Sequence, residues 1–128
     1  MIVTFEGRFA KRKQDLICDL VSFAQDQMFP EEDDVLINFE AIRRKDKYYG
    51  DCMYEDENEF TVRLNTLMTL EHLTLTVLHE MVHVSQFLKG LVMDNDSEYW
   101  DRWQEKEAHE KEQQLMERWT LDKTLNIT

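Results

Sequence analysis

The residues best suited to chemistry are two histidines four positions apart, His79 and His83, with Glu80 directly after the first. On a helix, side chains at this spacing lie one above the other on the same face, so both imidazoles can bind one metal ion. Zinc is the usual metal for a pair of neutral imidazoles, and a third protein ligand would leave a position open for water. Glu80 projects from a neighbouring face, where it can accept a proton from that water. The pentapeptide therefore predicts a zinc site with its own general base.

The surrounding residues predict the helix that this site needs. Apolar residues recur at helical spacing from about Leu70 to Lys89, and no proline or glycine occurs in this stretch before Gly90. The residues between the two histidines are uncharged, which suits a buried metal site because a stray charge there would cost desolvation. Gly90 fits a helix C-terminal cap. The alternative is a pair of core histidines without a metal, but this does not explain Glu80 in an otherwise apolar segment.

A third ligand is expected on the next helix, predicted from about Ser97 to Trp119. Residues 90–96 are too few for more than a turn, so the two helices should run antiparallel. The residue about ten positions into the second helix should then lie level with the histidines, and that residue is Glu107. It shares a predicted stripe with two tryptophans, where a zinc ion would neutralise its charge. Glu107 is the predicted ligand, and Glu105 and His109 are the alternatives. The other interpretation of Glu107 is a solvated glutamate on the helix surface.

The rest of the chain predicts a single α+β domain spanning residues 1–128. With 42% hydrophobic residues, it can form a modest core. The expected elements, in order, are a strand at residues 2–5, a helix at about 8–28, strands at 35–42, 48–54 and 60–64, and the two helices described above. The three later strands, with a turn at residues 56–58, predict a small and mostly antiparallel sheet.

Composition limits the classes of partner. The net charge is −12, from 27 acidic and 15 basic residues, which disfavours nucleic-acid binding and makes a basic peptide or protein segment the more natural substrate. No apolar run approaches a membrane span and no secretory leader is recognisable, so we expect a cytoplasmic protein that does not bind membranes. Cys18 and Cys52 are expected to be reduced thiols. The sequence does not predict the oligomeric state.

Taken together, these residues resemble the gluzincin branch of the zincin metallopeptidases. That branch carries HExxH on one helix and a glutamate ligand on the next, often followed by alanine. Residues 76–84 fit the extended helix pattern of the family, Ser85 departs mildly from it, and Glu107-Ala108 matches the pair at the third ligand. The specific motifs cover only about residues 76–108. The chain length and the order of elements resemble the minimal, single-domain members.

The resemblance implies a zincin-like fold and the hydrolysis of peptide bonds. Zinc would be held by His79, His83 and Glu107. Glu80 would take a proton from the activated water and pass it to the leaving amine. The strand at 48–54 resembles the edge strand that pairs with an extended substrate. A residue that stabilises the oxyanion is also expected. Tyr99 is the candidate catalytic residue for this role, and Tyr49 and His109 are the other candidates.

Two alternatives remain open at this point. The first is a zinc-stabilised interaction or regulatory domain that hydrolyses nothing. Glu80 argues against it, because a purely structural site does not need a base and usually closes its fourth position with another cysteine or histidine. The second is a latent enzyme blocked by its own tail, residues 119–128, which carries scattered apolar residues.

Overall fold

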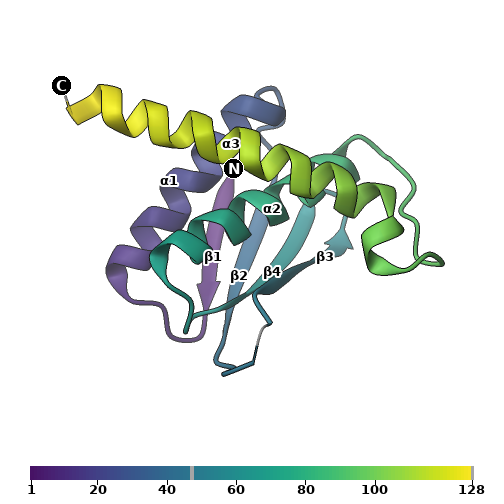
Figure 1. The fold of residues 1–128 in the computed structure, drawn as a ribbon, viewed down its shortest axis with the longest axis horizontal. Coiled ribbons are helices and arrows are strands. Elements are labelled where there is room, and N and C mark those ends of the chain that lie inside the picture. The colour runs from purple at the N-terminus through teal and green to yellow at the C-terminus, as the bar shows by residue number, and fades with distance from the viewer. Residues whose placement is uncertain (47, 128) are drawn as a thin grey trace.

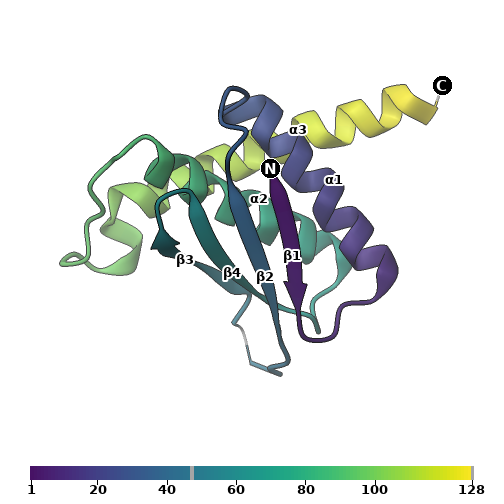
Figure 2. The same cartoon turned by 180° about the vertical axis from the view of Figure 1, so that it is seen from behind.

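The computed structural model describes residues 1–46 and 48–127, without the side chains of residues 125–127. Its elements are β1 (Ile2–Glu6), α1 (Lys11–Met28), β2 (Leu36–Ile42), β3 (Gly50–Asp56), β4 (Glu59–Asn65), α2 (Leu70–Leu88), the 3₁₀ turn η1 (Tyr99–Asp101) and α3 (Trp103–Ile127). The helices pack on one face of the sheet (Figure 1), and the view from behind shows the other face without a helix over it (Figure 2). The predicted α+β class is confirmed.

The sheet is mixed, with strand order β1-β2-β4-β3. β1 pairs with β2 and β2 with β4 in parallel, and only β3 pairs with β4 in antiparallel orientation. The prediction of a mostly antiparallel sheet is therefore wrong. Helix α1 crosses over between β1 and β2, which makes that pair parallel. The β3–β4 hairpin then brings β4, rather than β3, beside β2. Alternating apolar residues locate strands but do not reveal their partners, so the sequence pattern missed this arrangement.

The hydrophobic core lies between the sheet and the helices. Alternate residues of the strands face it, so that Phe39, Phe60 and Val62 are almost fully buried. On the other face, polar residues of the strands point outward, as the half-buried Thr61 and Arg63 do. Helix α2 runs through the middle of this core, and eleven of its residues are buried, Glu80 and His83 among them. The predicted helix around the two histidines is thus confirmed, and it is held in place by the core.

Strand β3 forms one edge of the sheet and begins against helix α2. A Cβ atom at Gly50 would lie 2.6 Å from the backbone oxygen of Arg63 and 3.1 Å from Cγ2 of Thr76. Only a residue without a side chain can therefore occupy this point without moving the strand or its neighbours. The absence of a side chain at Gly50 thus sets how closely the edge strand approaches the helix that carries the histidines.

The link between α2 and α3 is longer than predicted. The left-handed conformation of Gly90, with φ of 72°, confirms the predicted cap. The chain then continues as a loop in which Oδ1 of Asp94 accepts hydrogen bonds from the backbone N–H groups of Asp96 and Ser97, at 3.0 and 3.1 Å. Such a side chain–backbone turn competes with helix formation. As a result α3 begins at Trp103 rather than at Ser97.

Residues 119–127 continue helix α3 instead of forming a separate tail. Trp119 packs edge-on against Phe23 of α1, with ring centroids 5.3 Å apart. Beyond this contact the helix continues to the C-terminal end of the structure, whereas the turn η1 lies at the other end of α3 (Figure 1). Thr128 and the side chains of the predicted apolar positions Leu125 and Ile127 lie outside the described structure. None of the helices within residues 1–46 and 48–127 combines the length and apolar character that crossing a membrane requires.

Candidate metal centre

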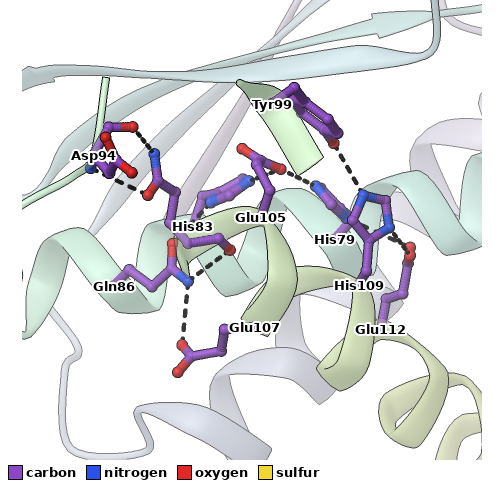
Figure 3. A network of polar contacts seen from close by, with 10 residues as sticks. His79, His83, Gln86, Asp94, Tyr99, Glu105, Glu107, His109 and Glu112 are labelled. Atoms are coloured by element: carbon purple, nitrogen blue, oxygen red, sulfur yellow. Dashed lines mark hydrogen bonds and ion pairs between the residues drawn. The ribbon is translucent and has the colours of Figure 1, made fainter. Parts of the chain in front are cut away.

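Helix α2 directs both histidines at one carboxylate on helix α3. Nε2 of His79 lies 3.0 Å from Oε1 of Glu105, and Nε2 of His83 lies 3.1 Å from the same oxygen (Figure 3). All three side chains are largely shielded from solvent, with exposed fractions of 12%, 9% and 14%. Two imidazoles four residues apart and one carboxylate from the facing helix therefore converge on one point, as a metal site requires.

The structure does not bring Glu107 to the histidines. Its Oε1 instead accepts a hydrogen bond from Nε2 of Gln86 at 3.1 Å and lies 3.7 Å from Nζ of Lys111, and its side chain is 35% exposed. Two residues along a helix point about 160° apart, so Glu105 and Glu107 cannot both face α2. The prediction of Glu107 assumed a helix starting at Ser97. Because α3 starts later, the residue that meets the histidines lies in its first turn, and it is the alternative ligand Glu105.

The far side of the His83 ring is fixed by Gln86, one helical turn further along α2. Nδ1 of His83 lies 2.8 Å from Oε1 of Gln86. The amide nitrogen of Gln86 donates to the backbone oxygen of Gln104 and to Glu107, each at 3.1 Å, so its oxygen must face the histidine. His83 therefore carries a proton on Nδ1 and turns Nε2 toward Glu105. This is how residues behind a metal ligand usually set its tautomer.

The far side of the His79 ring meets Glu112 of α3. Nδ1 of His79 lies 3.6 Å from one carboxylate oxygen of Glu112, and Nδ1 of His109 lies 2.8 Å from the other. Nε2 of His109 is in turn 3.0 Å from the hydroxyl oxygen of Tyr99 in η1. Our sequence predictions included neither Gln86 nor Glu112. The seven-residue spacing of Glu105 and Glu112, two turns of one helix face, is the signal that could have pointed to both carboxylates.

The carboxylates around the two histidines favour the positively charged form of each imidazole ring. Burial lowers the pKa of His79, but its hydrogen bonds with Glu105 and Glu112 outweigh this and raise the pKa to about 10. The pKa of His83 is also raised, mainly by Glu105 acting against burial. The two histidines in turn hold the pKa of Glu105 below its usual range, although burial opposes them. A metal ion replaces protons at such ligands, so these residues fit a divalent cation.

Glu80 takes no part in the hydrogen bonds that join His79, His83 and Glu105. It is 4% exposed, and one of its carboxylate oxygens lies within 4.8 Å of a ring nitrogen of His79 and of His83. Burial raises the pKa of Glu80 to about 7, against the opposing effect of the two histidines. A carboxyl group with such a pKa gains and loses a proton near neutral pH, which is what a general base needs.

Two cavities of about 250 and 240 Å³ flank Glu80. Both are lined by Gly50 at the start of β3, by His79 and Glu80 of α2, and by Tyr99 of η1. The first extends along α2 past His83, whereas the second extends in the other direction and is lined by the residues Tyr49, His72, Leu75, Thr76, His109 and Glu112. A ligand that crosses Glu80 would thus have space on both sides.

The three candidates for stabilising an oxyanion all lie near this space. Tyr99, Tyr49 and His109 each line the second cavity, and Tyr99 lines the first as well. Tyr49 is 47% exposed and packs against the ring of His72, with centroids 5.5 Å apart. The hydroxyl of Tyr99 is held by His109, whose Nε2 lies 3.0 Å away.

No model of a known protein family matches this chain, and no curated protein or solved structure matches it either.

Proposed function

We propose that this protein is a small zinc-dependent metallopeptidase in which His79, His83 and Glu105 hold the ion. The observation that carries the proposal is the convergence of both Nε2 atoms on Oε1 of Glu105, at 3.0 and 3.1 Å. Gln86 and Glu112 support it, because each occupies the Nδ1 side of one histidine. Bound zinc would polarise the scissile carbonyl group and acidify a water molecule.

Glu80 supplies the proton transfers in this proposal. Its carboxylate is buried next to the ligands and faces open space. With a pKa raised to about 7 by burial, it can take a proton from the attacking water and then protonate the leaving amine. The same carboxylate can perform both steps because it lies at the junction of the two cavities.

The edge strand β3 suggests how a substrate is held. β3 pairs only with β4 among the described strands, so one row of its backbone groups is free to bind an extended chain. The cavities on both sides of Glu80 leave room for residues before and after the scissile bond. We therefore propose an internal segment of a peptide or unfolded protein as the substrate.

The position of Glu80 also favours an enzyme over a zinc-stabilised interaction domain. A structural site would present a fourth ligand and would have no use for a carboxylate that opens onto two cavities beside the ligands. Blocking of the site by residues 119–127 receives no support, since this part of α3 packs on α1 at Phe23 and extends away from η1.

Metal analysis combined with peptide cleavage tests the proposal. The purified protein should hold one zinc ion per chain and cleave members of a quenched-fluorescence library of mixed peptides. A chelator should abolish cleavage, and added zinc should restore it. A protein that holds zinc and cleaves no member of the library, with or without residues 119–128, would favour the interaction domain instead.

A further inference from the structure

Arg102 brings a positive charge to the first of the two cavities beside Glu80. The residue lies between the turn η1 and the start of α3, and it is half-buried. Phe87 of α2 and Met93 of the loop after α2 line the same cavity, which extends along α2 past His83. Arg102 therefore lies on one side of Glu80 and beside apolar surface.

The loop before α3 fixes the Arg102 side chain. Its Nε atom donates a hydrogen bond to the backbone oxygen of Ser97 at 3.0 Å, and Ser97 belongs to the turn around Asp94. The buried Gln104 holds the backbone of Asp94, because its Oε1 accepts from the N–H group at 3.1 Å and its Nε2 donates to the carbonyl oxygen at 2.7 Å. Hydrogen bonds from Ser97, together with the charge of Arg102, lower the pKa of Asp94. The guanidinium group is thus held by contacts within the chain, so that a ligand needs to order it little.

Carboxylates also line this cavity, and they have other contacts or roles. Asp51 forms an ion pair with Arg63, whose Nε lies 2.8 Å from Oδ1 of Asp51. Oε1 of Glu105 meets both histidines, and Glu80 is the proposed base. Since these contacts do not involve Arg102, a negatively charged group of a ligand can meet its guanidinium group.

The chemistry of the guanidinium group selects the kind of ligand. Ser97 accepts from Nε, and the N–H groups on the two terminal nitrogens can bind both oxygens of a carboxylate. Building on the proposed peptidase function, we propose that Arg102 binds a carboxylate of the substrate in the first cavity. The methylene groups of a glutamate side chain would then lie against Phe87 and Met93. The net charge of the chain favours a basic substrate, whereas this local contact selects an acidic residue.

Matched pairs of peptides test the contact through kcat/KM. The peptides are taken from the cleaved members of the library, carry amidated C-termini, and differ only in Glu or Gln at one position beside the cut. At one such position Glu should raise kcat/KM by about 10-fold or more, as expected for hydrogen bonds to a charged partner. Arg102→Gln should abolish this preference and cleave the Gln peptide within about threefold of the parent rate. Arg102→Lys, which keeps the charge but not the paired donors, should retain part of the preference.

Arg12→Gln is the control for the lost charge, because Arg12 is an exposed residue of α1, away from both cavities. This variant should keep the full preference for Glu. An Arg102→Gln variant that slows both peptides of a pair equally would show that Arg102 binds a backbone carbonyl or only holds the loop, and would overturn the proposal. Peptides without acidic residues, with a free or an amidated C-terminus, distinguish the two sources of a carboxylate. A preference for the free end that Arg102→Gln abolishes would assign the same contact to the end of the substrate chain.

Binding without turnover separates this inference from the proposed function. Fluorescence anisotropy with the zinc-loaded Glu80→Gln protein should show tighter binding of the Glu peptide by about 10-fold, and the additional substitution Arg102→Gln should remove the difference. Zinc content and circular dichroism check that each variant is folded. Equal binding of both peptides by Glu80→Gln would overturn the inference without any variant of Arg102. If the binding preference is found but the parent protein cleaves no peptide, the proposed function fails while the carboxylate contact stands.

Discussion

Substitution of the two neighbouring glutamates tests which of them belongs to the metal centre. Glu105→Gln and Glu107→Gln remove the same charge from positions two residues apart on α3. In the structure, one oxygen of Glu105 meets both histidines at 3.0 and 3.1 Å, whereas Glu107 contacts Gln86, which in turn contacts His83. Glu105→Gln should therefore remove a ligand, and Glu107→Gln only a remote support.

The expected magnitudes differ widely. Structural sites with four ligands bind zinc with about 10–16 kcal/mol, or about 2.5–4 kcal/mol for each ligand, so Glu105→Gln should weaken binding by roughly two to three orders of magnitude. Residues directly behind a ligand contribute about 10- to 100-fold. Glu107 lies one contact further away and is 35% exposed, so we expect a loss below about 10-fold.

Competition with a chromophoric zinc chelator measures both affinities. Circular dichroism of the metal-free variants serves as the control, since a variant that does not fold would lose zinc for another reason. Normal affinity in Glu105→Gln together with a large loss in Glu107→Gln would refute the structural assignment and restore the original prediction of Glu107.

Three further predictions concern the surroundings of the site. Gln86→Leu leaves Nδ1 of His83 without its partner, so zinc affinity in the same competition assay should fall about 10- to 100-fold, and an unchanged affinity would contradict the role of Gln86. Gly50→Ala places a Cβ atom 2.6 Å from a backbone oxygen, so chemical denaturation should show a loss of about 1–3 kcal/mol, with zinc content unchanged if only β3 moves. Burial raises the pKa of Asp51, but hydrogen bonds from Arg63 and Tyr48 outweigh this and lower the pKa below its usual value. The ionised Asp51 therefore stabilises the folded protein above the unfolded pKa of about 3.9, and this stabilisation is lost as pH falls through the lower folded pKa. Acid unfolding of Asp51→Asn should consequently depend less on pH than that of the parent protein, and equal slopes would exclude this linkage.

The sequence predicted the helix that carries both histidines well, because its apolar spacing and its end signals agree. Apolar spacing from Leu70 to Lys89, the cap at Gly90 and the pair of histidines all indicate one helix, and α2 spans Leu70–Leu88. The first strand and the first helix were also located to within a few residues, since Pro30 and clear apolar spacing mark them. These are local signals, and they do not depend on how the chain folds back on itself.

The carboxylate that faces the two histidines could not be predicted reliably, because it depends on where α3 begins. Ser97 resembles a helix start, but the Asp94 turn and η1 use these residues instead, and α3 begins at Trp103. The tryptophans were also misleading, since Trp100 lies before α3 and is 69% exposed. The buried stripe is formed by Gln104, Ala108 and Leu115. A glutamine within that stripe gives no hydrophobic signal, so the helix face was assigned incorrectly.

The parallel pairing of the sheet was hidden for a related reason. The strands at residues 36–42 and 59–65 are neighbours in space, but β3 lies between them in the sequence. Short loops and alternating residues favour pairing of consecutive strands, which holds for β3 and β4 only. Which strand becomes the free edge above α2 is decided by tertiary packing, including the close approach at Gly50.

The central claim is that zinc held by His79, His83 and Glu105 hydrolyses peptides with Glu80 as the base. The most direct test compares peptide cleavage by the zinc-loaded parent protein and by zinc-loaded Glu80→Gln, at equal zinc content. Because Glu80 makes no contact that the ligands need, the variant should retain one zinc per chain. Its kcat should fall by at least about 100- to 10,000-fold. Turnover by Glu80→Gln at the rate of the parent protein would contradict the mechanism.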